Sequence, residues 1–464
     1  MKSEFDLVVV GGGPAGYSSA IRGITKGWRV CLIEQEKLGG TCLNWGCFPT
    51  KCLIRDAQLF SDINHAEFVE GEFRLIFEKV VDRKDHVILD LVHGIQSVLL
   101  NRGVEVIEGK GMILNSKKIR IAEKDGTDVI VTGRKIVIAT GSDLTSAPFQ
   151  NGGEKILSNR DALTLKTLPK NLLIVGGGRR GIEFATIFRG FGCEVTVIEK
   201  KDRILPKEDA EISQRLRRIL TMQGIKVMLN AEAVEAKISD SGSVNVTLES
   251  RKGVNQIEAE NMLVLGQRVG NTEGLGLEKL GMVLENGFVQ VNDTFETSVP
   301  DIYAVGDVNG RGFLAHKSLA EGIFAVDHMS GTGIPFNFRL IPRCTYTNPE
   351  VASIGLTQEE AEETGDEIEV GKFPVGASGR ALTLGQDQGI IKIISGKRYG
   401  EILGFHMLAP QATELIAVAS LAMRNELGVE EVKAAIYGHP TMSEAIFEAA
   451  LDVRGEAIHF IKGN

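Results

Sequence analysis

Residues 6–16 read DLVVVGGGPAG, an apolar strand that leads directly into a glycine-rich loop, and this stretch decides the fold. Residues 172–181, LLIVGGGRRG, repeat the pattern further along the chain. In both copies a second apolar strand follows and ends in an acid, Glu34 or Glu199, 23 residues after the first loop glycine. The repeated arrangement of strand, loop, helix and acid predicts an internal duplication.

Each copy has the residues that a dinucleotide-binding loop needs. The first glycine makes a tight turn, the second lets the backbone approach a pyrophosphate, and the third packs the helix against the strand. The helix N-terminus supplies N–H donors, and the acid accepts hydrogen bonds from a ribose. The alternative is a parallel sheet that binds no dinucleotide. The predicted binding residues are Gly11, Gly13, Pro14, Gly16 and Glu34 in the first copy, and Gly176, Gly178, Gly181 and Glu199 in the second.

Two of the six cysteines lie five positions apart in the segment GGTCLNWGCFPTK, residues 39–51. We expect this segment to be a loop that enters a helix. A helix N-terminus lowers the pKa of a cysteine, and the thiolate is the form that attacks disulfides. Cys42 and Cys47 are therefore candidates for a redox pair, although their spacing alone is equally typical of two buried, reduced cysteines.

Composition narrows the class of protein. The 464 residues exceed the size of one hydrophobic core, so several domains are expected. A net charge of −9 without a dense Lys/Arg block argues against a nucleic-acid partner. No uncharged apolar run reaches the roughly 18 residues that a membrane span needs, and the first residues show no cleavable signal pattern. We therefore expect a cytoplasmic protein without membrane insertion, whose partner is a small molecule or a protein.

The glycine loop, the cysteine segment and two later motifs together resemble the pyridine nucleotide-disulfide oxidoreductases along the whole chain. The later motifs are IATGS at residues 138–142 and YAVGD at residues 303–307. Within that superfamily, LAHK at 314–317, YTNPEVASIGLT at 346–357 and GHPTMSE at 438–444 are similar to the dihydrolipoamide dehydrogenases. The resemblance implies FAD and NAD as cofactors. It also implies oxidation of protein-bound dihydrolipoyl groups to the disulfide, with NAD⁺ as the final electron acceptor.

The resemblance also implies the roles of the cysteines and of the residues nearest the flavin. Cys42 exchanges with the dithiol substrate, and Cys47 lies against the flavin as the charge-transfer thiolate. Lys51 matches the family lysine near the flavin, and Glu183 matches its ion-pair partner. The other FAD-binding residues that the resemblance implies are Gly40, Thr41, Gly111, Thr140, Gly141, Ser142, Asp307, Leu314, Ala315 and His316, and no metal site is predicted.

By the same resemblance, His439 is the general base that takes the proton from the dithiol, and Glu444 orients it. Such a base is needed because dithiol pKa values lie well above neutrality. A cis peptide before Pro440 would aim the imidazole. The alternative for Glu444 is a structural one, because the Thr441–Glu444 stretch is also a capping-box pattern.

The fold class that we predict is α/β, with two Rossmann-like dinucleotide-binding domains and a C-terminal α+β dimerisation domain. From Arg339 onward, β-rich apolar segments precede an alanine-rich helix over residues 413–426. The predicted domains are 1–145 for FAD binding, 146–271 for NAD binding, 272–338 for completing the FAD site and 339–464 for dimerisation. Because family members share their active sites between subunits, the resemblance implies a homodimer, with lipoyl-carrying domains of a multienzyme complex as further partners.

Departures from the family pattern concentrate in the predicted NAD-binding domain. Arg179 and Arg180 occupy loop positions that are usually apolar or aromatic, and we hypothesise that two cations there weaken ordinary NAD use. Residues 267–271, QRVGN, replace the usual Gly-Arg-x-Pro-Asn. Glu199 favours NAD over NADP because an acid accepts from the ribose 2′-hydroxyl and repels a 2′-phosphate. Cys52 adds a thiol next to Lys51, and the resemblance gives it no role.

Two other functions are open at this point. One is an FAD-dependent reductase that acts on a different dithiol or disulfide, or that uses an altered electron acceptor. The other, of a different class, is an assembly or binding subunit with a degraded NAD pocket. The intact set of Cys42, Cys47, His439 and Glu444 argues against a mere binding subunit.

Overall fold

The computed structural model describes residues 3–123, 126–145, 149, 154–333, 337 and 340–461. They form two compact units, each assembled from segments that are distant in the sequence. Unit 1 consists of Met1–Cys52, Glu78–Pro148 and Gly266–Phe336, and unit 2 consists of Leu53–Phe77, Phe149–Leu265 and Asn337–Asn464. The four-domain division expected from the sequence is finer than these two units and stays a prediction.

Unit 1 is built on a parallel sheet in the order β3-β2-β1-β5-β18. Leu7, Val8 and Val9 of β1 are fully buried, as expected for a parallel sheet that is covered on both faces. A further strand, β4, pairs antiparallel with the ends of β3 and β5. The strands are β1 (Glu4–Val10), β2 (Val30–Glu34), β3 (Glu105–Ile113), β4 (Lys118–Glu123), β5 (Asp128–Ile138) and β18 (Ile302–Ala304).

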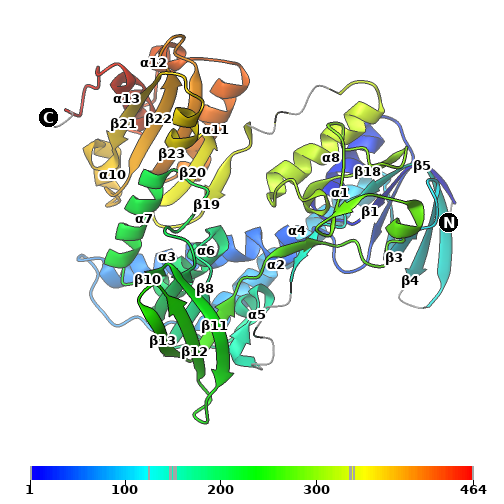
Figure 1. The fold of residues 1–464 in the computed structure, drawn as a ribbon, viewed down its shortest axis with the longest axis horizontal. Helices are drawn as coiled ribbons and strands as arrows, with labels where there is room; N and C mark the ends of the chain where they lie inside the picture. Colours follow the sequence, from blue (N-terminus) through cyan, green and yellow to red (C-terminus); the bar gives the residue numbers. More distant parts are fainter. Residues whose placement is uncertain are drawn as a thin grey trace. The chain divides into compact units, whose positions relative to one another are not determined.

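Helices α1 (Pro14–Thr25) and α8 (Ala315–Met329) lie side by side in unit 1 (Figure 1). Their close approach requires Gly322, because a Cβ there would lie 2.4 Å from the carbonyl oxygen of Ala15. Two helices have residues in both units: α3 (Cys47–His65) begins in unit 1, and α4 (Phe77–Asn101) lies in unit 1 after its first residue. The smaller elements of unit 1 are α2 (Gly40–Trp45), β6 (Ser142–Leu144), β15 (Arg268–Gly270), η2 (Leu277–Leu280), β16 (Leu284–Glu285), β17 (Phe288–Val289) and η3 (Gly306–Asn309).

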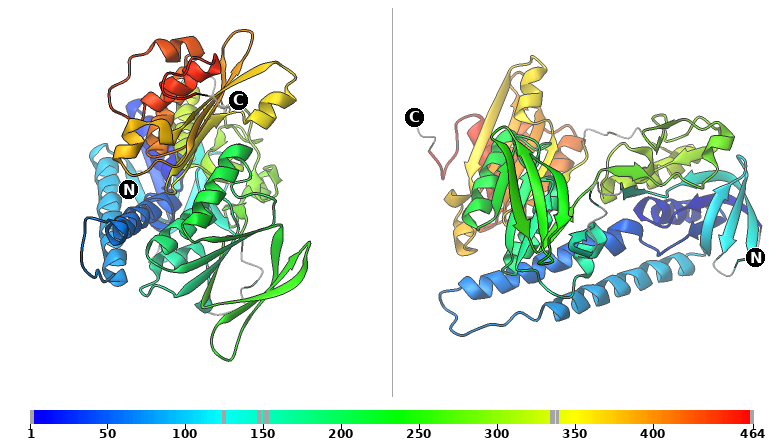
Figure 2. Two further views of the ribbon diagram at one scale, coloured as in Figure 1. Left: turned by 90° about the vertical axis from the view of Figure 1, so that its left-hand side faces the viewer. Right: turned by 60° about the horizontal axis from the view of Figure 1, so that its bottom comes forward.

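The first sheet of unit 2 repeats the strand order of unit 1. It is parallel, in the order β10-β9-β8-β14-β7, so that β8 corresponds to β1 and β9 to β2. An antiparallel ribbon, β11-β12-β13, follows β10 and is green in Figure 2. The elements are β7 (Ile156–Leu157), α5 (Asn159–Thr164), β8 (Asn171–Val175), α6 (Arg179–Gly190), β9 (Glu194–Glu199), α7 (Ala210–Met222), β10 (Lys226–Leu229), β11 (Ala231–Ile238), β12 (Val244–Ser250), β13 (Gly253–Ala259) and β14 (Asn261–Val264).

The C-terminal part of unit 2 is the predicted α+β region. Its antiparallel sheet has the order β19-β20-β23-β22-β21, and every residue of β22 is buried. The expected alanine-rich helix is present as α11. The elements are β19 (Arg343–Thr345), β20 (Glu350–Gly355), α9 (Gln358–Glu363), β21 (Ile368–Pro374), η5 (Val375–Ala377), α10 (Gly379–Thr383), β22 (Ile390–Gly396), β23 (Ile402–Ala409), α11 (Ala412–Arg424), α12 (Val429–Ala434) and α13 (Glu444–Val453).

The predicted fold class is confirmed, since two parallel sheets with the same strand order are followed by an antiparallel sheet with helices. Among the helices of the described residues, none combines the length and the apolar character that a membrane span requires.

Candidate functional site

The two glycine-rich loops have the same backbone geometry. Gly11 and Gly176 take positive φ angles of 107° and 112°, a region that favours glycine. A Cβ at Gly16 would lie 1.7 Å from the carbonyl oxygen of Gly11, and a Cβ at Gly181 would lie 1.8 Å from that of Gly176. At the third position of each loop, only glycine lets the helix start this close to the strand, because any side chain would overlap that carbonyl oxygen.

The acid that ends the second strand reaches back to the loop in both units. Glu34 accepts a hydrogen bond from the N–H of Gly12 at 2.6 Å, and Glu199 accepts one from Gly177 at 2.7 Å. Burial raises the pKa of Glu34, although the N–H groups of Glu36 and Gly12 act against this. Both carboxylates are thus held at the loop, where the sequence predicted a ribose-binding acid.

The residues present fit a dinucleotide in each unit. Helices α1 and α6 begin after Gly13 and Gly178, and within the described chain no side chain caps either helix, so first-turn N–H groups are available to a phosphate. A Cβ at Gly178 would meet no atom within 4 Å, and the nearest atom to one at Gly13 would be 3.8 Å away. This open backbone permits the approach of a pyrophosphate.

Cys42 and Cys47 lie in contact in unit 1 and are not joined by a disulfide. Cys42 is in the short helix α2 and Cys47 is the first residue of α3, so the predicted loop is mostly helical. The pKa of Cys42 is raised, chiefly by its hydrogen bond to Cys47 and then by burial, while the nearby Lys51 ammonium acts to lower it. A raised pKa keeps the proton on Cys42, and Cys47 is the first residue of α3.

Tyr17, a residue that was not predicted from the sequence, lies beside the two thiols. Its pKa is raised by burial and then by electrostatic interaction with Cys42 and Cys47. Because Tyr17 follows the third loop glycine directly, helix α1 brings the first dinucleotide loop and the cysteine pair to one place.

Arg268 forms hydrogen bonds with two of the sequence motifs of unit 1, IATGS (138–142) and YAVGD (303–307). Its Nη1 donates to the hydroxyl of Ser142 at 2.8 Å and to Asp307 at 3.3 Å, and Ser142 donates to Asp307 at 2.9 Å. Asn271, which follows β15, and Thr140, which precedes β6, exchange reciprocal hydrogen bonds. The segment 267–271 lies in unit 1, and its Arg268 and Asn271 contact the predicted FAD-binding motifs.

A buried ion pair supports the YAVGD segment from helix α8. Lys317 Nζ lies 2.5 Å from Glu321, and both side chains are almost completely buried. Glu321 also accepts hydrogen bonds from the N–H of Gly306 at 2.6 Å and from the Asn309 amide at 3.0 Å. The other predicted FAD-binding residues also lie in unit 1: Gly40 and Thr41 at the start of α2, Gly111 in β3, Gly141 after β5, and Leu314, Ala315 and His316 at the start of α8.

Glu183 and the two loop arginines lie at the start of helix α6 in unit 2. Glu183 is buried and accepts a hydrogen bond from the N–H of Tyr346 at 3.0 Å. The charge of Arg179 acts on the buried carboxylate Glu208, which also forms an ion pair with Arg343 at 3.3 Å. Because Lys51 belongs to unit 1, the expected pairing of Lys51 with Glu183 stays a prediction.

His439 and Glu444 form an imidazole–carboxylate dyad in unit 2. His439 Nδ1 lies 2.8 Å from one oxygen of Glu444, and the N–H of Thr441 donates to the other at 2.7 Å. The peptide before Pro440 is cis. Although burial alone would raise it, the pKa of Glu444 is lowered by these two hydrogen bonds and by the charges of His439 and His459. Glu444 is also the first residue of α13, but the N-cap is Ser443 and no side chain of the described residues caps this helix, so the predicted capping box is not formed.

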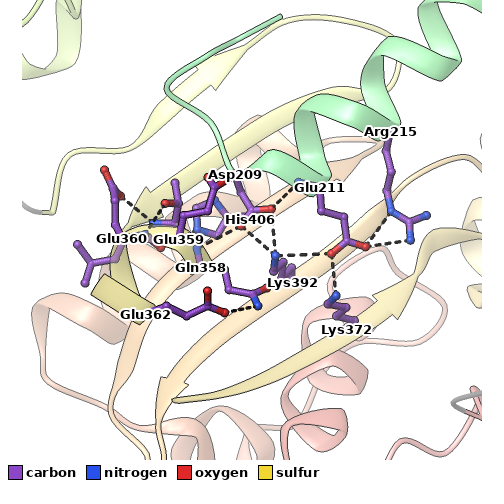
Figure 3. Close-up of polar contacts among 12 residues, drawn as sticks. Asp209, Glu211, Arg215, Gln358, Glu359, Glu360, Glu362, Lys372, Lys392 and His406 are labelled. Carbon is purple, nitrogen blue, oxygen red and sulfur yellow. Dashed lines mark hydrogen bonds and ion pairs between the residues drawn. The ribbon is translucent and has the colours of Figure 1, made fainter. Parts of the chain in front are cut away.

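A buried polar cluster fixes helix α7 to the C-terminal sheet within unit 2 (Figure 3). Asp209, the N-cap of α7, binds Lys392 of β22 at 2.9 and 3.0 Å, and Glu211 binds Lys372 at 2.8 Å. His406 is fully buried beside them, and this burial lowers its pKa to about 4. This cluster could not be predicted from the sequence, because its partners are up to 183 residues apart.

Comparison with known proteins agrees with this site. Residues 5–322 match the family described as Pyridine nucleotide-disulphide oxidoreductase, and residues 341–450 match its dimerisation domain. A dihydrolipoyl dehydrogenase of Bacillus subtilis (strain 168) is 39% identical over 475 residues, which cover 99% of this chain and 100% of that protein. The structure of LpdA from Mycobacterium tuberculosis is 29% identical, with a TM-score of 0.90, over 97% of this chain and 99% of that one.

A further solved structure is the Cu(II) complex of the HOCl-induced flavoprotein disulfide reductase RclA from Escherichia coli. It is 29% identical, with a TM-score of 0.87, over 97% of this chain and 99% of that one. The cofactors predicted from the sequence, FAD and NAD, are those of the matched family, and its dimerisation domain supports a homodimer. With both family matches and a full-length relative, this chain belongs to the pyridine nucleotide-disulphide oxidoreductase family as a flavoprotein disulfide oxidoreductase.

Proposed function

We propose that this protein oxidises dihydrolipoyl groups to lipoyl disulfide and transfers the electrons to NAD⁺. The observation that carries this proposal is the contact between Cys42 and Cys47, with the proton held on Cys42 and Lys51 nearby. A pair arranged in this way is suited to exchange with a vicinal dithiol. The full-length similarity to a dihydrolipoyl dehydrogenase supports this choice of substrate.

The cysteine pair carries out the thiol exchange. When the pair is oxidised, a substrate thiolate attacks Cys42 Sγ, and a mixed disulfide forms as the bond between Cys42 and Cys47 breaks. The electron pair of the broken bond stays on Cys47 as a thiolate. The second substrate thiolate then attacks the substrate sulfur of the mixed disulfide, which closes the lipoyl ring and releases Cys42, which takes a proton. When bound, FAD supplies the two-electron acceptor between the Cys47 thiolate and NAD⁺.

His439 acts as the base that makes the substrate thiolate. Since Nδ1 is bound to Glu444, the Nε2 atom of the neutral ring is left to accept the thiol proton. The ionised Glu444 then stabilises the imidazolium. The lowered pKa of Glu444 keeps this carboxylate ionised at working pH. In the homodimer, the dyad of one subunit completes the cysteine site of the other, so an isolated subunit would be inactive.

Unit 1 would hold FAD through its glycine loop, Glu34 and the segments around Ser142 and Asp307. Unit 2 would hold NAD⁺ through the second loop, with Glu199 selecting against the 2′-phosphate of NADP. The proposal also includes lipoyl-carrying protein domains as partners and a cytoplasmic location, both of which rest on the sequence.

A second candidate is a flavoprotein reductase with another disulfide substrate or another electron acceptor. The observation that favours it is the pair Arg179 and Arg180 at the entrance of the second dinucleotide loop. The similarity to a flavoprotein disulfide reductase points in the same direction.

Steady-state rates with different thiols separate the two candidates. We expect dihydrolipoamide with NAD⁺ to give a kcat/KM about 100-fold or more above those for glutathione and for dihydrolipoamide with NADP⁺. The variant His439→Gln tests the dyad and is expected to lose about 100-fold or more. Absence of NADH formation from dihydrolipoamide, together with efficient reduction of another disulfide, would establish the second candidate.

A further inference from the structure

Helix α13 supplies the carboxylates of two imidazole–carboxylate dyads that are built in the same way, and the two histidines lie in the segments before and after the helix. Besides the pair of His439 and Glu444, His459 Nδ1 lies 2.7 Å from one oxygen of Glu448. The second oxygen of Glu448 accepts hydrogen bonds from the N–H groups of Ile458 and His459 at 2.9 and 3.2 Å. In both dyads, one carboxylate oxygen thus orients the imidazole, and the other binds the backbone close to that histidine.

The second dyad is held firmly, although its imidazole faces outward. The Glu448 side chain is 4% exposed, and that of His459 is 70% exposed. The chain turns back after α13 at Gly455, whose φ is 72°, and the ring of Phe460 packs edge-on against Phe373 at 6.5 Å. A buried carboxylate and a packed aromatic ring therefore fix a histidine whose Nε2 is directed away from the carboxylate.

The two dyads lie next to each other. Glu444 and Glu448 are four residues apart on one helix, so they lie on the same face one turn apart. The charge of His459 is one of the influences on the first carboxylate, Glu444. A proton on either imidazole is therefore close to the other dyad.

The other charged side chains around α13 are bound to partners of their own. Lys433 binds Glu456 at 2.6 Å and Glu430 at 3.1 Å. Arg454 pairs with Glu369 and Glu430, and Asp452 accepts the backbone N–H of Lys372 at 2.8 Å. Among the described residues, His459 is bound to Glu448, and its charge acts on Glu444 of the first dyad.

We propose that His459, held by Glu448, is a second proton-binding imidazole of the dithiol site, and that it positions and tunes His439 for its work as a base. This inference rests on the proposed function of His439. His459 acts through the first dyad, so it is a positioning residue rather than a catalytic one.

The sign of the coupling follows from the charges. A protonated His459 opposes protonation of His439, whereas an ionised Glu448 favours it. His459→Gln leaves the Glu448 charge without its imidazole, so His439 holds its proton to higher pH. Glu448→Gln removes the negative charge and keeps the imidazole, so His439 loses its proton at lower pH.

The test is the pH profile of kcat/KM for dihydrolipoamide in the holoenzyme, measured for both variants. We expect the acid limb to move up by about half a pH unit in His459→Gln and down in Glu448→Gln. A purely structural role would lower the rate in both variants without shifts of opposite sign. His86→Gln, on the exposed face of α4 in unit 1, is the matched control and should leave the profile unmoved.

NMR titration of the imidazole of His439 gives a second readout that does not depend on activity, and the chain has only eight histidines to resolve. The same shift of about half a unit is expected in His459→Gln. An unchanged titration of His439 in both variants overturns the inference, even if His439→Gln abolishes dithiol oxidation. If the wild-type enzyme does not oxidise dihydrolipoamide, the proposed function fails, and the titration alone decides whether the dyads are coupled.

Discussion

The two dinucleotide-binding sheets have the same backbone and different surroundings. Both have the same strand order, the same positive φ at the first loop glycine, and an acid bound to the N–H of the second. They differ at the helix that follows, which begins with Pro14 and Ala15 in unit 1 and with Arg179 and Arg180 in unit 2. In the part of the chain that the structure describes, a cysteine pair lies next to the first sheet's loop helix, α1. The backbone thus determines that a dinucleotide binds, and the neighbouring side chains determine the chemistry.

The largest expected effect comes from the cysteines that distinguish unit 1. Cys42→Ser and Cys47→Ser should each lower dithiol-driven NADH formation by about 1000-fold or more, because the serine hydroxyl does not exchange with a disulfide. Electron transfer from NADH to a small quinone should stay within about threefold of wild type, since it needs the dinucleotide sites alone. Parallel loss of both activities would show that the two units do not divide the reaction in this way. Cys52→Ser is the matched control.

Alanine at the third loop glycine tests whether the two loops serve different cofactors. In Gly16→Ala the added Cβ overlaps the carbonyl oxygen of Gly11, so we expect loss of bound flavin or of folding. Gly181→Ala should keep flavin and its reduction by dithiol, but lose about 100-fold in NAD⁺ turnover. Flavin content and anaerobic flavin reduction are the measurements. Gly94→Ala, in α4 with open space around it, is the control, and loss of flavin in Gly181→Ala would contradict the assignment.

The buried His406 should make the stability of unit 2 depend on pH. Its folded-state pKa is about 4, below the ordinary value of about 6.5, so the unfolded chain takes up the proton first. The stability that this group contributes is complete above pH 6.5 and is lost as the pH falls towards 4. Between pH 7.5 and 4.5 the loss is about 2.5 kcal/mol. Urea unfolding of wild type and His406→Gln should show a weaker pH dependence in the variant, and equal slopes would contradict the burial argument.

The smallest expected effect concerns the arginines that distinguish unit 2. If they weaken ordinary NAD use, Arg179→Tyr combined with Arg180→Ile should lower the KM for NAD⁺ by about three- to tenfold and leave flavin reduction by dithiol unchanged. Arg217→Ala removes an exposed charge of α7 and serves as the control. An unchanged or higher KM would show that the arginines assist the dinucleotide.

Local patterns predicted the parts of the site that depend on neighbouring residues. The cis peptide before Pro440 and the dyad of His439 and Glu444 are present where the family resemblance placed them. The glycine loops, their acids and the cysteine pair are present where the local patterns placed them. Each of these depends on spacing within one short segment or one repeated unit. Such signals survive in a single sequence because the backbone between the residues is fixed by one loop or one helix.

Contacts between distant segments could not be predicted. Tyr17 is an ordinary helix residue until helices α2 and α3 bring the thiols beside it, and Arg268 contacts Ser142, 126 residues away. Lys392 and Lys317 are lysines that a sequence places on the surface, yet both are buried in ion pairs. Their burial depends on the packing of sheets and helices, which no local pattern reports.

The most direct test of the account is anaerobic reduction of the purified holoenzyme by dihydrolipoamide, followed by addition of NAD⁺. We expect long-wavelength charge-transfer absorbance from the Cys47 thiolate and flavin, and then NADH with return of the oxidised flavin spectrum. Charge transfer without NADH would keep the cysteine chemistry and contradict NAD⁺ as acceptor. A flavin that dihydrolipoamide leaves oxidised would contradict the central claim.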